Sequence, residues 1–347
     1  MDRERDSAPL RPGEELDAVA LAAYLRGKIE GAENDVTLEQ FPGGHSNLTY
    51  LVHAGAFEYV LRRAPLGPVV PKAHDMAREY RLLAKVHPLF RAAPNVYLLC
   101  EDTSVVGSVF FLMERRRGVV LRDRVPDELQ AEPDFGARVS RAFLDCLVDL
   151  HAIDIERHEL TVLGRPEGFI SHQVSGWSDR WNRSKTEELH EMVEVMRWLA
   201  GTIPESGPPT LVHNDYKLDN IMLDAADPGR IEAVLDWEMA TVGDPLADLG
   251  LTLCYWTLGS ASAGERAGIS AGAGWFSRDE LVGRYAARTG RDVSQVRYYE
   301  VLGVFKLAVI LQQIYFRYVR GQTRDERFRT FGERVRGLVK TAAGLIL

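Results

Sequence analysis

The chain has 347 residues, of which 46% are hydrophobic and 27% charged, and its formal net charge is −8. This length is enough for two domains that each have a hydrophobic core. The composition is that of a soluble globular protein. The negative charge argues against nucleic acid as a bulk partner, because phosphate backbones are bound by basic surfaces.

The N-terminus and the cysteines predict a cytoplasmic protein. Residues 1–6 are mostly charged and no apolar segment follows them, so no signal peptide is expected. The apolar stretch 301–316 contains Lys306 and is interpreted as a core helix, so no membrane partner is expected either. Reduced and buried thiols are predicted for the three cysteines, which lie far apart in apolar stretches: Cys100, Cys146 and Cys254.

The first predicted elements are a mobile arm over residues 1–15 and a helix over 15–31. The inward positions of this helix are expected to be Leu16, Val19, Leu21 and Leu25.

A glycine-containing turn follows within residues 41–52. Two glycines and then small polar residues precede alternating apolar residues, which indicates a strand–turn–strand hairpin. Backbone N–H groups of such a turn can hold phosphate oxygens. A plain hairpin with a glycine turn is the alternative. The candidate phosphate-binding residues are Gly43, Gly44, His45, Ser46 and Asn47.

The next strand, 58–65, contains Arg62 and Arg63 and precedes a helix over 73–86. The planar fork of an arginine can pair with phosphate, although two solvated arginines on an edge strand would explain the pattern as well. The helix is amphipathic. Its apolar face is expected to consist of Met76, Tyr80, Leu83 and Val86.

Two further strands, 96–100 and 108–113, lead to an abrupt change from apolar to charged residues at Glu114. This change predicts a domain boundary that divides the chain into residues 1–114 and 115–347. The second part is mainly helical by periodicity. Its tryptophans are interpreted as core residues: Trp177, Trp181 and Trp198.

The loop that follows the short strand 210–212 is the strongest functional signal. His213, Asp215 and Asn220 have the spacing of the kinase catalytic loop, and Asp236 follows as a candidate metal ligand on the next hairpin. Asp215 can accept a proton from a hydroxyl, and Asn220 and Asp236 offer oxygen atoms suited to Mg²⁺. Ordinary turn residues are the alternative interpretation.

A helix is predicted to begin after this hairpin. Asp244 is a suitable N-cap and Pro245 a suitable first helical residue, and Asp248 is expected to brace the catalytic loop. Residues 259–274 are rich in glycine, alanine and serine and are interpreted as a loop over the substrate.

With these residues assembled, the chain resembles the aminoglycoside phosphotransferase family of the protein-kinase-like superfamily. It is similar to the branch that occurs as the kinase-like domain of acyl-CoA dehydrogenase fusion proteins, and to stand-alone bacterial relatives. The resemblance extends from the glycine turn through 235–238 to 243–249. It implies an α+β, bilobal fold, with a small antiparallel-sheet N-lobe and a mainly helical C-lobe.

The resemblance also implies roles for individual residues. Asp215 corresponds to the catalytic aspartate, within a loop that includes His213 and Lys217, and Asn220 and Asp236 to the metal ligands. Arg62 stands where the wider kinase pattern has a nucleotide-binding lysine, with Glu79 as its helix partner, and Asn214 stands where the family usually has glycine. The adenine is expected to meet the main chain of Met113, Glu114 and Arg115.

The expected activity is ATP- and Mg²⁺-dependent phosphorylation of a hydroxyl group on a small molecule. Segments 168–183 and 251–276 contain few carboxylates, which favours a hydroxyacyl-CoA-like acceptor over a polycationic aminoglycoside. The alternatives are an aminoglycoside O-phosphotransferase and a catalytically weak nucleotide-binding regulatory module. A protein kinase is disfavoured, because Asp236 is followed by Trp-Glu instead of Phe-Gly. The oligomeric state is not predicted.

Overall fold

The computed structural model describes residues 6–41, 47–65, 75–122, 124–258, 269–272, 274–323 and 325–347. The chain forms two compact units. The first consists of Met1–Gly118 with Glu232–Glu238, and the second of Val119–Ile231 with Met239–Leu347. The segment 232–238, which the predicted division assigns to the second domain, therefore belongs to the first unit.

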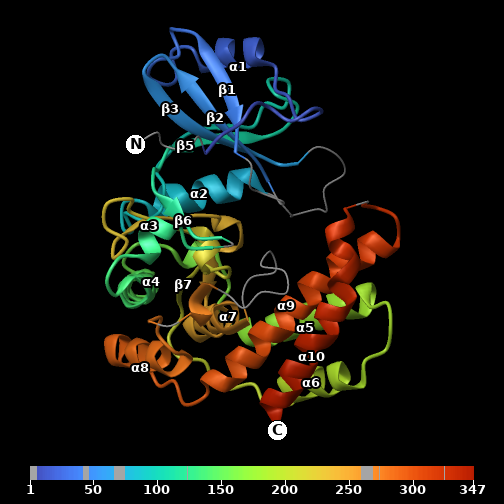
Figure 1. Cartoon of the computed structure of the whole chain (residues 1–347). Coiled ribbons are helices and arrows are strands. Elements are labelled where there is room, and N and C mark those ends of the chain that lie inside the picture. The colour runs from blue at the N-terminus through green and yellow to red at the C-terminus, as the bar shows by residue number, and fades with distance from the viewer. Residues whose placement is uncertain are drawn as a thin grey trace. The chain divides into compact units, whose positions relative to one another are not determined.

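The first unit is built on a five-stranded antiparallel sheet with the strand order β1-β2-β3-β5-β4 (Figure 1). Its helices are α1 (Ala18–Leu25) and α2 (Met76–Val86). The strands are β1 (Val36–Gln40), β2 (Leu48–Ala54), β3 (Phe57–Arg63), β4 (Val96–Cys100) and β5 (Phe110–Glu114). These elements confirm the strands predicted over 58–65, 96–100 and 108–113 to within a few residues.

Because side chains alternate along a strand, the two faces of this sheet carry different residues. One face packs with Leu21 and Leu25 of α1, and the other lies against α2, where the ring of Tyr80 meets that of Phe111. Adjacent arginines on the central strand β3 must therefore point to opposite faces. Both are buried, so the interpretation of Arg62 and Arg63 as solvated residues on an edge strand is wrong.

The N-terminal segment is attached to the sheet over the part that the structure describes. Ala8 forms a β-bridge with Gln40, and the hydroxyl of Tyr50 donates to the carbonyl oxygen of Glu14 at 2.6 Å. The predicted mobile arm is thus wrong for residues 6–14. The helix that follows is shorter than predicted, and Val19 is 81% exposed instead of buried.

The second unit is mainly helical. It contains the short strands β6 (Val119–Val120), β7 (Thr210–Val212), β8 (Ile221–Leu223) and β10 (Thr241–Gly243), with β6 paired to β8 and β7 to β10. Strand β9 (Ile231–Val234) leads into the segment of the first unit. The helices are α3 (Asp127–Gln130), α4 (Phe135–His151), α5 (Phe169–Ser184), α6 (His190–Gly201), α7 (Pro245–Leu258), α8 (Arg278–Thr289), α9 (Val296–Val319) and α10 (Phe331–Ile346).

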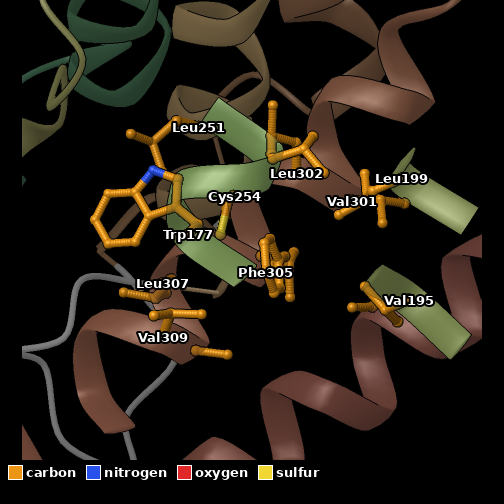
Figure 2. Close-up of a cluster of buried hydrophobic side chains, with 14 of the residues drawn as sticks. Trp177, Val195, Leu199, Leu251, Cys254, Val301, Leu302, Phe305, Leu307 and Val309 are labelled. Carbon is orange, nitrogen blue, oxygen red and sulfur yellow. The ribbon is translucent and has the colours of Figure 1, made fainter. Parts of the chain in front are cut away.

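Helix α9 is the centre of this unit and packs against α5, α6, α7 and α10. Figure 2 shows the side chains that meet around it, among them Trp177, Cys254 and Phe305. The helix is long and apolar enough to cross a membrane, but 67% of its most apolar window is buried within the fold. That burial agrees with the predicted core helix. The predicted core positions of Trp177 and Trp181 and the predicted burial of all three cysteines are also confirmed.

Candidate active site

The candidate catalytic loop connects β7 to β8. It begins at His213, directly after Val212, and ends in a short 3₁₀ turn, Leu218–Asn220. His213, Asn214 and Asn220 are buried, whereas the side chains of Asp215 and Lys217 are 16% and 21% exposed. The loop therefore presents a carboxylate and an ammonium group at its accessible side.

The carboxylate of Asp215 is held by three side chains of the second unit. Its Oδ1 accepts a hydrogen bond of 2.8 Å from the hydroxyl of Tyr255. Its Oδ2 lies 2.9 Å from both Nζ of Lys217 and Nδ2 of Asn220, and the same amide nitrogen donates to the Asp215 carbonyl oxygen. The carboxylate is thereby oriented, as a general base must be.

Asp248, in the first turn of α7, holds the start of the loop. Its two carboxylate oxygens accept from the backbone N–H of His213 at 2.6 Å and of Asn214 at 2.7 Å, and His151 lies 3.3 Å away. Burial by itself raises the pKa of Asp248, but the contacts with His151 and His213 outweigh it and lower the pKa below its ordinary value. The predicted bracing role of Asp248 is confirmed. The predicted N-cap of α7 is also confirmed, since the side chain of Asp244 accepts a hydrogen bond from the backbone N–H of Leu246.

Asn214 has a left-handed backbone, with φ of 63°. This conformation explains the glycine that the family usually has here, because glycine adopts it without strain and asparagine is one of the few other residues that tolerate it. The side-chain amide of Asn214 donates to the main-chain carbonyl oxygen of Met239 at 3.1 Å. The main-chain carbonyl oxygen of Asn214 accepts a hydrogen bond of 2.8 Å from Nζ of Lys306.

Tyr255 and Lys306 are residues of this site that the sequence did not identify as functional. In the sequence, Tyr255 belongs to the carboxylate-poor segment 251–276, and Lys306 to the stretch interpreted as a core helix. Burial and the neighbouring Asp215 raise the pKa of Tyr255 well above its ordinary value, so the phenol stays protonated. Burial lowers the pKa of Lys306 to about 8. A lysine within an otherwise apolar run was the one sequence signal available for it.

A second cluster lies entirely within the first unit. The guanidinium of Arg62 lies 3.3 Å from the carboxylate of Glu79 on α2 and 3.0 Å from Oδ1 of Asp236. Burial opposes its charge, but Glu79 and Asp236 outweigh that effect and raise the pKa of Arg62. Burial raises the pKa of Glu79 to about 7; Arg62 opposes this rise, and Asp236 and Glu238 add to it. The predicted pairing of Arg62 with Glu79 is therefore present.

Arg63 has a separate, structural environment. Its guanidinium donates to the carbonyl oxygen of Val106 at 2.7 Å, on the sheet face opposite Arg62. Of the two arginines, only Arg62 lies beside Asp236.

The segment after β9 is held by its own unit. Asp236 has a left-handed backbone, with φ of 64°. Glu238 accepts a hydrogen bond of 2.8 Å from Nδ2 of Asn47, and its carbonyl oxygen accepts from Arg78 at 2.9 Å. Asn47, the last residue of the predicted phosphate-binding turn, is buried here. Gly43, Gly44, His45 and Ser46 lie outside the described residues.

The predicted adenine contact at the end of β5 stays a prediction. The N–H of Glu114 donates to the carbonyl oxygen of Asn95 at 2.8 Å, and Met113 is paired within the sheet. The guanidinium of Arg115 contacts Asp6 and the ring of Phe41.

The structure thus gathers the predicted residues into two groups. His213, Asp215, Lys217 and Asn220 belong to the second unit. Asn47, Arg62, Glu79 and Asp236 belong to the first. The two candidate magnesium ligands, Asn220 and Asp236, are in different units, so their joint role stays a prediction.

Together, the small antiparallel sheet of the first unit and the mainly helical second unit define the class as a protein with a kinase-like fold. The chain belongs to the Phosphotransferase enzyme family (APH), whose family model matches residues 37–286. This confirms the resemblance drawn from the sequence.

Relatives among curated proteins cover almost the whole chain. It is 32% identical to acyl-CoA dehydrogenase family member 11 of Rattus norvegicus over 99% of the chain, and 31% identical to the Homo sapiens protein of that name over 99%. The Arabidopsis thaliana protein IBR3, named as a probable acyl-CoA dehydrogenase, is 27% identical over 95% of the chain. The chain spans 45% or less of the length of these relatives.

Solved structures confirm the α+β, kinase-like fold. A protein of Ralstonia eutropha, provisionally named an aminoglycoside phosphotransferase, has 29% identity and a TM-score of 0.81, over 95% of this chain and 98% of its own. Choline kinase of Cryptosporidium parvum has 14% identity and a TM-score of 0.63, over 94% and 98%. A thermostable mutant of the aminoglycoside phosphotransferase APH(4)-Ia, in complex with AMP-PNP and hygromycin B, has 19% identity and a TM-score of 0.59, over 94% of this chain and 100% of its own.

Proposed function

We propose that this phosphotransferase moves the γ-phosphoryl group of ATP to a hydroxyl group of a small molecule. The observation that carries the proposal is the oriented carboxylate of Asp215, with contacts of 2.8–2.9 Å to Tyr255, Lys217 and Asn220. Such a carboxylate, at the accessible side of a braced loop, suits a general base for a hydroxyl group.

In this mechanism the acceptor hydroxyl donates to Asp215 and passes its proton to that carboxylate. The acceptor oxygen forms a bond to the γ-phosphorus while the bond from the γ-phosphorus to the bridging oxygen breaks, and ADP leaves. Lys217, which lies beside Asp215, is suited to steady the transferring group, and Arg62 to pair with the phosphates.

The donor atoms of Asn220 and Asp236 fit Mg²⁺, which prefers oxygen ligands and few protein groups. Asn220 uses its amide nitrogen on Asp215, which leaves the amide oxygen for a cation. When bound, the ion would neutralise phosphate charge. Asp236 has a counter-charge in the structure, the guanidinium of Arg62.

For the acceptor, we propose an anionic, hydroxyl-bearing compound such as a hydroxyacyl-CoA. Two cations lie near the carboxylate of Asp215: Lys217 contacts it, and Lys306 is close enough for Asp215 to raise its pKa, while Arg180 acts on Lys306 in the opposite direction. Arg180 stacks on the ring of Trp177 at 4.3 Å. A polycationic aminoglycoside would meet repulsion from these groups. The names of the curated relatives, acyl-CoA dehydrogenases, also favour an acyl thioester.

Two alternatives remain open. The named bacterial and antibiotic-bound neighbours favour an aminoglycoside as acceptor. The replacement of the usual lysine by Arg62 favours a catalytically weak nucleotide-binding regulatory module.

The first experiment tests Asp215→Asn against wild type, with Asp279→Asn on the exposed end of α8 as the control. The amide cannot accept the proton, so transfer should fall by about 10²–10⁴-fold while ATP binding and the melting temperature are retained. Turnover close to wild type in Asp215→Asn would remove that residue from the role.

The second experiment compares acceptors. ATP consumption is measured with kanamycin-like aminoglycosides and with hydroxyacyl-CoA compounds at equal concentration. The proposal expects turnover with the thioesters. Efficient aminoglycoside phosphorylation without thioester turnover would establish the alternative acceptor, and ATP binding without any turnover would support the regulatory module.

A further inference from the structure

Lys306 is a charged residue in the middle of the apolar core helix α9 and is 6% exposed. Burying an ammonium group is costly unless it is paired and hydrogen-bonded. Its Nζ lies 2.8 Å from the carbonyl oxygen of Asn214 and 5.6 Å from the ring centre of Trp177. A core helix that only needed an apolar surface would gain nothing from this side chain.

The carbonyl oxygen that Lys306 contacts belongs to the peptide bond between Asn214 and Asp215. Other groups of Asn214 are held as well, its N–H by Asp248 and its side-chain amide by the carbonyl oxygen of Met239. With φ of 63°, this backbone is in the left-handed region, which asparagine tolerates, and the contacts with Asp248, Met239 and Lys306 add to the restraint on it. The orientation of the peptide plane that carries Asp215 therefore depends on these contacts.

We propose that Lys306 is a positioning residue for phosphoryl transfer, which holds the Asn214 carbonyl oxygen and so fixes the peptide plane that directs Asp215. This inference rests on the proposed role of Asp215 as the base.

The charge of Lys306 contributes together with its hydrogen bond. The charged groups that influence it are Asp215 and Asp248, which favour the ammonium form, and Lys217 and Arg180, which oppose it. With burial as the largest cause, the pKa of Lys306 is about 8. Above that pH the amine still donates a hydrogen bond, but the bond is weaker because hydrogen bonds from charged donors are the stronger ones.

The first test is independent of activity. Hydrogen exchange at pH 7 is followed by mass spectrometry in peptides covering 213–217, for wild type, Lys306→Met, Lys306→Arg and the control Lys340→Met on the exposed side of α10. Lys306→Met should exchange faster in this loop by about tenfold, while Lys306→Arg and Lys340→Met stay near wild type. Exchange in Lys306→Met at the wild-type rate overturns the proposal.

The second test is kinetic. Lys306→Met should lower kcat by about tenfold or more and leave the KM for ATP within about twofold, because the residue acts through Asp215 and not on the nucleotide. In wild type, kcat should decline as the pH rises through about 8, and Lys306→Arg, which stays charged, should lose that decline.

The outcomes separate the two proposals. A wild-type kcat in Lys306→Met, or an unchanged alkaline decline in an active Lys306→Arg, overturns the positioning role. If wild type shows no transfer to any acceptor, the proposed function fails, and the hydrogen-exchange result alone decides whether Lys306 braces the loop. If neither Lys306 variant folds, Lys306→Gln, which keeps a neutral donor, is measured by the same two methods.

Discussion

Tyr255, in the last turn of α7, donates a hydrogen bond of 2.8 Å to Oδ1 of Asp215. The other oxygen, Oδ2, is occupied by Lys217 and Asn220, so in the proposed mechanism the tyrosine contacts the oxygen that would accept from the hydroxyl of the acceptor. Because the phenol is buried and its pKa is raised, it acts as a donor and fixes the rotation of the carboxylate. The aromatic ring also lies 5.0 Å from Nζ of Lys217, so one residue positions both groups of the loop.

Replacing Tyr255 by phenylalanine should lower kcat by about 10- to 100-fold, since a hydrogen bond to a charged group contributes about 1.5–3 kcal/mol. The KM for ATP should change little. Steady-state kinetics at saturating ATP measures this, with Tyr318→Phe on the exposed end of α9 as the control. A Tyr255→Phe enzyme with wild-type kcat would show that the other contacts suffice to orient Asp215.

Replacing Asp248 by asparagine should destabilise the protein by about 3 kcal/mol, because a buried carboxylate that accepts two backbone N–H groups would be replaced by an amide that can satisfy only one. Urea unfolding at pH 7 measures the difference in unfolding free energy between the two proteins.

The folded-state pKa of Asp248 is lowered, so the stabilisation that this carboxylate provides is present above the unfolded pKa of about 3.9 and is lost as the pH falls through the folded-state pKa. The difference in unfolding free energy between wild type and Asp248→Asn should therefore become smaller as the pH is lowered. A difference that is the same at pH 7 and at the lowest accessible pH would contradict this account.

Arg62→Lys should retain activity, and Arg62→Ala should lose ATP binding. A lysine keeps a cation between Glu79 and Asp236, whereas alanine leaves two carboxylates without it. Calorimetric titration with ATP and Mg²⁺ measures the affinity. Arg63→Met serves as the contrast, because its contact with the carbonyl oxygen of Val106 is structural. That variant should melt at a lower temperature and bind ATP normally. Normal ATP binding by Arg62→Ala would mean that another cation holds the phosphates.

Asp236→Ala should abolish Mg²⁺-dependent ATP binding, and Asn220→Ala should only weaken it. The carboxylate brings a negative charge to the cation and the amide does not. Titrations with and without Mg²⁺ separate the metal-dependent part of the affinity for each variant. Equal losses in the two variants would contradict the argument from charge.

Features that depend only on residues close together in the chain could be predicted from the sequence. The spacing of His213, Asp215 and Asn220 was readable because those residues belong to one short loop between two strands. The cap at Asp244 and the brace at Asp248 were readable for the same reason, since the first turn of a helix has a fixed geometry. Helix α2 and strands β3, β4, β5 and β7 were also predicted from the pattern of apolar residues.

Only the tertiary structure decided which distant side chains complete the site. Lys306 lies 92 positions after Asn214 in the chain, and Tyr255 lies 40 positions after Asp215. A helical pattern cannot distinguish a lysine or tyrosine that only packs in the core from one that contacts a functional loop. Periodicity shows which face of a helix is buried, but not which segment of the chain packs against that face. The same holds for Arg62 and Arg63. Alternation in a strand sends them to opposite faces, but which face meets α2 and Asp236 depends on how the sheet is packed.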